Sequence, residues 1–409
     1  MSTNISTQPR IAIIGAGLGG LALLLTLHRR GIPATVYERD TSFDARAHLG
    51  GSLDLGWKSG QRALRENALQ DAFDKHSRPE GEEMKICDST GNVHLKLGGE
   101  GEDGPGGPPQ GKEDIRPEID RTVLRKLLLD AVPADLVQWN HALSSVRALG
   151  DGQHELAFAN GTITTCDLLV GADGAHSRVR PLLSPAIPQF LGVNGAEISL
   201  APAATKLPAL AETIANVGQG TMMAMEDSRM LGAQVNGDGR IRTYAFLRAP
   251  ESWTLPADPS SAKAVLKEEF AGWAGWLLNL IDYCDESAIY PRALWSLPVR
   301  HKWAHVPGVT LLGDAAHLMS PFAGAGANLA LLDGLELGLA LASLKEKGTL
   351  GEVGAVSEAV KGFEENMCAM AGRVAAKANR TLEVCVGPGT PQAAIKRFGE
   401  VAASGEREG

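Results

Sequence analysis

The stretch RIAIIGAGLGGLALLLTLHRRG, residues 10–31, joins an apolar run, a glycine-rich turn and a longer apolar run. Residues 10–14 predict a buried strand, because consecutive apolar residues lead directly into the first glycine. The run that begins at Leu18 predicts a helix that ends at Gly31, a residue that commonly ends helices. The next stretch, PATVYERD at 33–40, predicts a second strand. A strand, a helix and a strand in this order favour a parallel sheet covered by helices.

The glycines of GAGLGG have the spacing GxGxxG. Gly15 permits the tight turn, Gly17 lets a pyrophosphate approach the backbone, and Gly20 lets helix and strand pack closely. Glu38 ends the second strand about 20 residues later, where an acid accepts the hydroxyls of a ribose. The motif therefore predicts a dinucleotide site bound by these residues and their neighbours Leu18, Gly19 and Arg39. A glycine-rich turn without a ligand is the alternative, and the strand, helix and acid around the motif disfavour it.

Length and composition bound the class of protein. At about 150 residues a domain, 409 residues suggest two or three units. The net charge of -9 argues against nucleic acid or an anionic membrane as partner. Five scattered cysteines without CxxC spacing favour free thiols, with neither disulfides nor a metal site. The polar N-terminus is not a signal peptide, and no run reaches the roughly 18 apolar residues of a membrane span. We expect a monomeric cytoplasmic protein.

Two further motifs follow apolar strands. CDLLVGADGAHSRVR, 166–180, contains Asp173, and VTLLGDAAHLMSP, 309–321, contains Asp314. With the glycine motif, and in this order, they resemble the three fingerprints of the group A flavin monooxygenases, the para-hydroxybenzoate hydroxylase-like family. The resemblance implies an α/β fold: a Rossmann-like FAD-binding domain, an inserted antiparallel-sheet substrate domain and a long C-terminal helix.

Three segments are similar to the tetracycline-inactivating flavin monooxygenases and their fungal relatives: GGSLDLGWKSGQRAL at 50–64, RPEIDRTVLRKLLL at 116–129 and GDAAHLMSPFAGAGAN at 313–328. The resemblance places Asp54 beside the flavin and has Arg121 and Arg46 approach the FAD. It assigns the ribityl hydroxyls to Asp314. The small residues after it would let backbone amides reach the flavin ring, which adds these cofactor contacts: Pro321, Gly324, Gly326, Ala327 and Asn328.

The expected organisation is discontinuous. The helical segments are EIDRTVLRKLLLDAV at 118–132, one helix at 261–281, and helices with breaks from 326 to about 385. Residues 98–112 are rich in Gly and Pro and predict a loop. We expect an FAD-binding domain at 1–80, 111–184 and 300–335, a substrate-binding domain at 81–110 and 185–299, a helical region at 336–390 that bridges them, and a tail at 391–409.

The resemblance also implies the reaction. FAD, bound tightly but not covalently, would be reduced by NADPH, and a flavin C4a-hydroperoxide would hydroxylate an aromatic or polycyclic molecule. A second GxGxxG after a strand is missing from the sequence, so NADPH would bind only transiently. The flavin performs the chemistry, so no catalytic side chain is expected. The alternatives are a flavoprotein oxidase or dehydrogenase, a flavin-dependent halogenase, and a non-enzymatic flavin- or drug-binding protein.

Substrate contacts are expected from Pro321, Phe322, Met223 and Arg242. The polar set with which tetracycline-inactivating enzymes hold their ring system is not reproduced, because Gly195 and Thr221 occupy two of its positions. This favours a mostly apolar secondary metabolite, or a tetracycline-like compound, over tetracycline itself.

Some motif residues have structural interpretations. Asp173 and Arg180 could form an ion pair at a turn. For His317 we favour a packing or hydrogen-bonding role over that of a general base, because no nucleophile accompanies it.

Overall fold

The computed structural model describes residues 8–46, 50–97, 111, 113 and 115–404. One end of the molecule is built on a parallel sheet with the order β19 (Val309–Leu311), β11 (Leu168–Gly171), β1 (Ile11–Ile14), β2 (Ala34–Tyr37) and β7 (Val137–Gln138). The central strand β1 and its neighbour β11 are buried along their whole length, as their unbroken apolar runs predict. The expected α/β class with a parallel first sheet is confirmed.

Two helices pack tightly beside this sheet. In α1 (Leu18–Arg29) and α9 (Gly326–Glu346), glycines allow the backbones to meet: a Cβ on Gly334 would lie 2.5 Å from the carbonyl oxygen of Gly19. Helix α9 is long and apolar enough to cross a membrane by composition alone. Because most of it is buried against α1, α2 (Gly60–Glu66) and α10 (Val353–Val386), we interpret it as a core helix.

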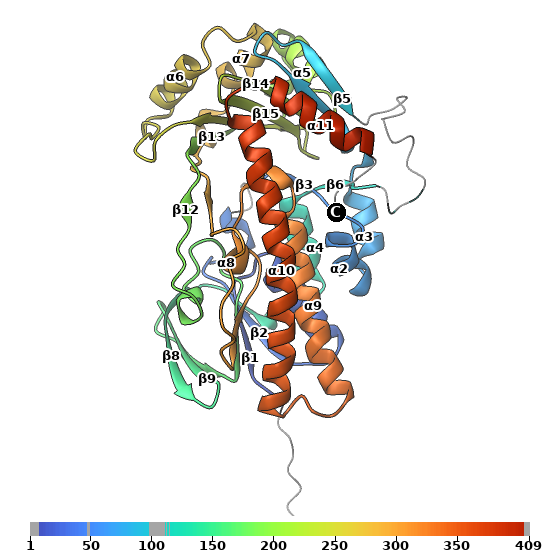
Figure 1. Cartoon of the computed structure of the whole chain (residues 1–409), viewed down its shortest axis with the longest axis vertical. Coiled ribbons are helices and arrows are strands. Elements are labelled where there is room, and N and C mark those ends of the chain that lie inside the picture. The colour runs from blue at the N-terminus through green and yellow to red at the C-terminus, as the bar shows by residue number, and fades with distance from the viewer. Residues whose placement is uncertain (1–7, 47–49, 98–110, 112, 114, 405–409) are drawn as a thin grey trace, which may run out of the picture.

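A second sheet lies at the other end of the molecule (Figure 1). Its order is β17 (Tyr290–Pro291), β13 (Val193–Leu200), β16 (Ile241–Arg248), β15 (Arg229–Val235), β14 (Thr221–Glu226), β4 (Met84–Cys87) and β5 (Val93–Leu97). All neighbours are antiparallel except β4 and β14. The outer face packs on α5 (Ala211–Val217), α6 (Pro259–Glu269) and α7 (Gly275–Asp282). We call this sheet the substrate sheet.

The expected single helix at 261–281 is wrong. The structure has α6 and α7 with a break between them, in which Gly272 adopts a φ of +84°. A positive φ cannot continue a right-handed helix, so the chain turns there.

A two-stranded ribbon connects the two sheets. β3 (Ser52–Asp54) pairs antiparallel with β6 (Glu118–Asp120), so the helix expected from Glu118 begins only at Arg121, as α4 (Arg121–Asp130). The sequence pattern missed β6 because its pairing partner lies more than 60 residues earlier.

The other regular segments are short. The helices and strands are α3 (Gln70–His76), β8 (Leu143–Gly150), β9 (Gln153–Phe158), β10 (Ile163–Cys166), β12 (Gln189–Phe190), β18 (Trp295–Ser296) and α8 (Asp314–His317). The 3₁₀ turns are η1 (Phe43–Arg46), η2 (Pro79–Glu82), η4 (Ala134–Leu136), η5 (Arg180–Leu182), η6 (Ala204–Lys206), η7 (Pro208–Leu210), η8 (Glu286–Ala288) and η9 (Pro321–Ala323).

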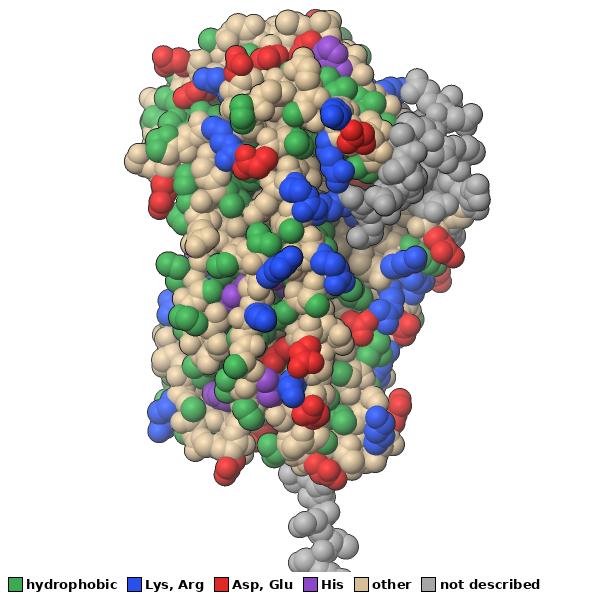
Figure 2. Space-filling model, in the orientation of Figure 1, with side chains coloured by type: hydrophobic (Ala, Val, Ile, Leu, Met, Phe, Trp, Pro, Cys, Tyr) green, Lys and Arg blue, Asp and Glu red, His purple; other side chains and the backbone are tan. Residues whose placement is uncertain are grey.

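Helix α10 runs alongside both halves of the molecule (Figure 1). Near its N-terminus Val360 and Phe363 belong to the core of the parallel sheet, and near its C-terminus Leu382 and Val386 pack on the substrate sheet. The segment expected as a tail, 391–409, contains α11 (Gln392–Ser404), which packs against α10 and β5. In Figure 2, Lys and Arg side chains gather over the C-terminal half of α10, although the net charge is -9.

Candidate functional site

The motif residues meet at one edge of the parallel sheet. Gly15 follows β1, Glu38 follows β2, Asp173 lies two residues after β11, and Asp314 lies three residues after β19. All four strands run in the same direction, so these residues come from their carboxyl ends. Open α/β sheets bind ligands at this edge.

The three motif glycines have separate structural reasons. Gly15 has a φ of +110°, and a Cβ there would clash with the carbonyl oxygen of Ala172 on the adjacent strand. A Cβ on Gly20 would clash with the carbonyl oxygen of Gly15. A Cβ on Gly17, in contrast, would meet no atom within 4 Å. Only Gly17 is therefore unexplained by the packing of the described residues, and it faces open space where a phosphate fits.

The neighbours of these glycines point into the protein. Leu18 is buried, and Gly19 lies against Leu312 and the carbonyl oxygen of Ala330, so a ligand could reach only their backbone. Glu38 is also buried, and its carboxylate accepts hydrogen bonds from the backbone N–H of Ala16 (2.7 Å) and of Asp40 (3.0 Å). The Glu38 carboxylate thus stabilises the glycine-rich turn through the backbone of Ala16. Arg39 is exposed, and Arg46 ends η1, with its side chain outside the described residues.

Two exposed charges lie near this edge. Asp314 is exposed although its neighbours Gly313 and Ala315 are buried, and it makes no hydrogen bond or ion pair within the described part of the chain. Arg121, at the start of α4, is also exposed, and its side-chain carbons lie against Gly50. A carboxylate that accepts hydroxyls and a cation at the loop of Gly50 fit the polar groups of FAD.

The other two charged motif residues, Asp173 and Arg180, form hydrogen bonds with the protein backbone. Asp173 and Arg180 do not form the ion pair considered above: Asp173 accepts from the backbone N–H of Arg178 (2.7 Å), and Arg180 donates to the carbonyl oxygens of Ala175 and Ala315. The reason is that Arg180 is buried beside two backbone carbonyls that need donors. One oxygen of Asp173, Oδ1, is buried without a hydrogen-bond partner in the described structure.

His317 is a hydrogen-bonding histidine, as expected. Its Nε2 lies 2.6 Å from Oδ2 of Asp333, which also accepts from the backbone N–H of Gly313 (2.9 Å). Burial by itself would lower the pKa of His317, but the charge and hydrogen bond of Asp333, with Asp314 beyond, outweigh it and raise that pKa. The pair fixes the turn before Asp314, so its role is to shape the loop.

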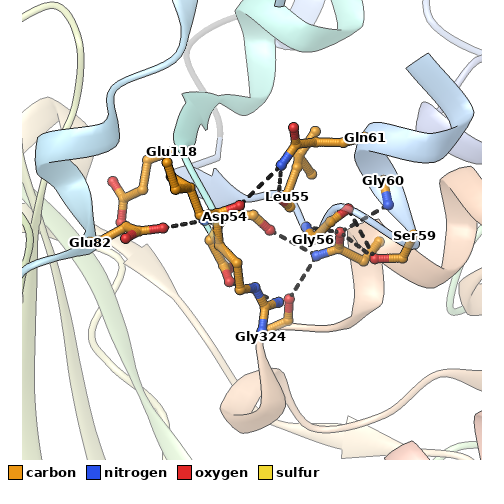
Figure 3. Close-up of polar contacts among 12 residues, drawn as sticks. Asp54, Leu55, Gly56, Ser59, Gly60, Gln61, Glu82, Glu118 and Gly324 are labelled. Carbon is orange, nitrogen blue, oxygen red and sulfur yellow. Dashed lines mark hydrogen bonds and ion pairs between the residues drawn. The ribbon is translucent and has the colours of Figure 1, made fainter. Parts of the chain in front are cut away.

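The turn after α8 approaches the loop of Asp54. Gly324 ends η9 in the left-handed region, and a Cβ there would lie 3.2 Å from Oδ1 of Asp54. Figure 3 shows Asp54 between Gly324 on one side and Glu82 and Glu118 on the other. Pro321 is exposed, and Gly326 and Ala327 are partly exposed in the first turn of α9. The expected cofactor contacts of this segment therefore border a common space with Asp54.

Asn328 differs from its neighbours because its side chain is fully used by the protein. Its Oδ1 accepts from the backbone N–H of Gly56 (2.9 Å) and Gly60 (3.1 Å) and from the hydroxyl of Ser59 (3.0 Å). Its Nδ2 donates to the carbonyl oxygens of Asp54 (2.7 Å) and Gly324 (3.4 Å). An amide with these partners has no capacity left for a cofactor. The structure assigns its side chain to the support of the Asp54 loop, and only its backbone could contact a ligand.

Replacing Asn328 by alanine is expected to lower the free energy of unfolding by about 2–4 kcal/mol, because two buried N–H groups lose their acceptor. Urea unfolding of the purified variant measures this. Asn160→Ala is the matched control, since Asn160 bonds the backbone at the exposed surface. A loss below about 1 kcal/mol in Asn328→Ala would contradict the support role.

Two carboxyl groups meet at this side of the site: Asp54, whose side chain is 38% exposed, and the buried Glu118. Partial burial raises the pKa of Asp54, although Arg116 lies 2.9 Å from its Oδ2 and opposes the shift. Glu118, directly opposite Asp54 across the β3–β6 pair, has a pKa raised to about 7, mainly by burial. The arrangement gives this side of the site a group that can hold a proton near neutral pH.

The inner face of the substrate sheet is largely apolar where it meets the turn of Phe322. Met223, Tyr244, Leu294 and Phe322 are only partly buried and belong to one cluster. Met222 points to the other face, as strand alternation requires. The Tyr244 hydroxyl makes no hydrogen bond in the described structure and lies 2.7 Å from where a Cβ of Gly51 would be. These side chains can enclose an aromatic molecule and offer it one polar contact.

Arg242 does not fit the role of a substrate contact. It is 3% exposed, and its guanidinium is bonded to the carboxylate of Glu197, which also binds Arg292 (2.7 Å). Engaging a substrate would break a buried ion pair, at a cost of several kcal/mol. The sequence alone could not show this, because Glu197 lies on the neighbouring strand β13.

Sequence reasoning missed four residues of this region: Arg116, Glu118, Gln234 and Tyr244. Arg116 and Glu118 stand in the quoted segment 116–129, so the signal was there but only Arg121 was singled out. Tyr244 stands two residues after Arg242 and therefore on the same face of β16. Nothing in the sequence pairs Gln234 with Glu118.

The comparisons with known proteins agree with the geometry. The family described as "FAD binding domain" matches residues 122–352. The chain is 30% identical to "Monooxygenase penA" of Penicillium thymicola, over 88% of this chain and 91% of that protein.

Solved structures have the same fold. HpxO of Klebsiella pneumoniae, complexed with FAD and uric acid, has a TM-score of 0.77 at 20% identity, covering 98% of this chain and 95% of HpxO. The tetracycline destructase Tet(55) has a TM-score of 0.68 at 21% identity, covering 98% and 97%. At such identities the likeness shows the fold alone.

The open space at Gly17 and the unpartnered carboxylate of Asp314 fit FAD, and the family match covers more than half of the chain. The chain therefore belongs to the FAD-binding-domain family of group A flavin monooxygenases and is an FAD-dependent monooxygenase.

Proposed function

We propose that this enzyme uses NAD(P)H and dioxygen to hydroxylate an aromatic or polycyclic small molecule held between the inner face of the substrate sheet and the turn of Phe322. The observation that carries the proposal is the partly buried cluster of Met223, Tyr244, Leu294 and Phe322, in which Phe322 belongs to the turn that Gly324 follows. A secondary metabolite or a tetracycline-like compound suits this mostly apolar surface.

The residues of the chain have defined parts in this reaction. Gly17 would admit the pyrophosphate, and Asp314 and Arg121 would hold the ribityl and polar end of the cofactor. When bound, FAD takes two electrons from NAD(P)H and transfers one atom of dioxygen to the substrate, while the other leaves as water. Phe322 and Met223 would exclude water, and the Tyr244 hydroxyl would orient an oxygen of the substrate.

Several features support the individual partners. Uric acid, the compound bound to HpxO, and the tetracyclines after which the destructases are named are polycyclic. NAD(P)H is a polyanion, and the Lys and Arg side chains over the C-terminal half of α10 attract anions to that face. We propose that the enzyme is a cytoplasmic monomer whose FAD-binding, substrate-binding and bridging regions have the boundaries expected above.

We expect NADPH to reduce bound FAD about tenfold or more faster when a substrate is bound. The loss of the yellow colour of the flavin measures the rate of this reduction. A screen of phenols and fused-ring enols for this bleaching identifies the substrate class. The product made under ¹⁸O-labelled dioxygen is expected to contain one labelled oxygen atom. An oxidase or dehydrogenase acting on a similar substrate is the second candidate, and unlabelled product with stoichiometric hydrogen peroxide would favour it over hydroxylation.

A further inference from the structure

The backbone of Glu118 lies between the two halves of the molecule. In β6 it stands opposite Asp54 of β3, on the cofactor side. On its other side its N–H donates to the carbonyl oxygen of Arg78 (3.1 Å), and its carbonyl oxygen accepts from the N–H of Arg78 (2.7 Å). Arg78 directly precedes η2, from which the chain enters β4 of the substrate sheet. The backbone of Glu118 thus lies between the strand of Asp54 and the entrance to the substrate sheet.

The side chain of Glu118 makes a second connection. It is 4% exposed, and its Oε1 accepts a hydrogen bond from Nε2 of Gln234 on β15 (3.0 Å). Gln234 in turn touches the cofactor side, because its Oε1 lies 3.1 Å from the position that a Cβ of Gly51 would take. Gln234 is therefore the side chain of the substrate sheet that contacts Glu118 and the loop before Asp54 together.

The second carboxylate oxygen has no such partner. Oε2 of Glu118 is buried without a hydrogen bond in the described structure, 3.6 Å from the guanidinium of Arg78. Gly81 packs directly on the carboxyl group, where a Cβ would come within 3.0 Å of it. A buried, partly satisfied carboxyl group would be avoided in a merely structural junction, since its desolvation is unfavourable.

We propose that Glu118 is a positioning residue, which fixes the strand carrying Asp54 against the substrate sheet through its hydrogen bond with Gln234. The inference rests on the proposed function, in which the sheet holds the substrate, and on the expected place of Asp54 beside the flavin. Because Glu118 is buried between β3 and the substrate sheet, it acts through these two elements.

The protonation of Glu118 makes the link measurable. Burial, with the charge of Asp54, raises its pKa from 4.5 to about 7, against the nearby Ser52 hydroxyl, the hydrogen bond of Gln234 and the charge of Arg78. Ionisation strengthens the hydrogen bond from Gln234, since a charged acceptor binds an N–H more tightly. The charged groups around it are Asp54 on β3, Arg78 and Glu82 at η2, and Arg116 and Asp120 on its own segment.

Three FAD-loaded proteins test the proposal beside the wild type: Glu118→Gln, Gln234→Leu and the matched control Gln153→Leu. Gln153 also donates to a carboxylate, that of Asp167 (2.8 Å), but it does so at an exposed position, at the start of β9. Flavin fluorescence and visible circular dichroism are recorded between about pH 5.5 and 8.5, together with the thermal unfolding midpoint.

The wild type and Gln153→Leu are expected to show a change in the flavin signals centred near pH 7, because burial raises the pKa of Glu118 to about 7. Both Glu118→Gln and Gln234→Leu are expected to lose that change, with an FAD dissociation constant within about threefold of the wild type. The pH dependence of the unfolding midpoint reports the protonation of Glu118 itself, whereas the flavin signals report whether that protonation reaches the flavin. The folded state binds the proton more tightly than the unfolded state, so stability falls as pH rises through the folded pKa. This fall is expected to persist in Gln234→Leu and to vanish in Glu118→Gln.

A flavin signal in Gln234→Leu that titrates like the wild type would overturn the proposal, and so would a wild-type signal that does not titrate. Should Glu118→Gln fail to fold, Gln234→Leu still decides. These readouts need no turnover: a protein that oxygenates no substrate but gives the expected titrations contradicts the proposed function alone. If the wild type oxygenates its substrate normally but Glu118→Gln and Gln234→Leu both titrate like the wild type, only the proposed role of Glu118 is contradicted.

Discussion

Asp314→Ala is expected to weaken FAD binding by about tenfold to a hundredfold while the apoprotein keeps its fold. A hydrogen bond to a charged group contributes about 1.5–3 kcal/mol, and a carboxylate on the ribityl chain makes at least one. The fold is insensitive because the Asp314 side chain is exposed and has no partner among the described residues. Titration of apoprotein with FAD, followed by quenching of flavin fluorescence, measures the dissociation constant.

The matched control is Asp71→Ala. Asp71 is also an exposed aspartate in the first turn of a helix, α3, so the substitution changes charge and helix dipole in the same way. It is expected to leave FAD affinity unchanged. Full retention of FAD by purified Asp314→Ala would count against a cofactor role for this carboxylate.

Gly17→Ala is expected to separate stability from cofactor binding. The backbone of Gly17 is extended, with a φ of -76°, and a Cβ there meets nothing within 4 Å. Alanine therefore fits the apoprotein, and the free energy of unfolding should stay within about 1 kcal/mol of the wild type. The added methyl group occupies the space where a pyrophosphate would lie, so FAD affinity should fall by about a hundredfold.

Gly15→Ala is the comparison for this variant. Its φ of +110° and the carbonyl oxygen of Ala172 exclude a methyl group, so the variant should lose both stability and FAD binding. Measuring urea unfolding of the apoproteins beside FAD affinity gives the two effects separately. If Gly17→Ala binds FAD as the wild type does, the pyrophosphate does not pass over this residue.

The sequence determined the cofactor edge because its information is local. The strand, turn and helix of residues 10–31 are fixed by neighbouring residues, and each remaining motif is a strand followed within three residues by its acid. Parallel strands bring such residues to one edge wherever they stand in the chain. The FAD-dependent class could therefore be predicted, as the family match confirms.

The structure gives some predicted site residues another role where their partner is distant in sequence. The sequence predicted Arg242 as a substrate contact, but its charge is taken by Glu197, 45 positions earlier. It predicted Asn328 as a cofactor contact, but its amide supports the Asp54 loop, 274 positions earlier. A buried polar group must be satisfied by whatever the fold places beside it, and side-chain type alone does not reveal that partner.

The sequence by itself determined the fold class, the cofactor and the glycine and acid that fit it, since these depend on short segments with one stable geometry. Only the tertiary structure decided which polar residues remain available and which are consumed within the protein. Among the described residues, it left Asp314 and the Tyr244 hydroxyl without a hydrogen-bond partner, and it joined Glu118 to Gln234. The physical reason is that hydrogen bonds and desolvation depend on distances in space, and β3, β6 and β15 approach one another only in the folded chain.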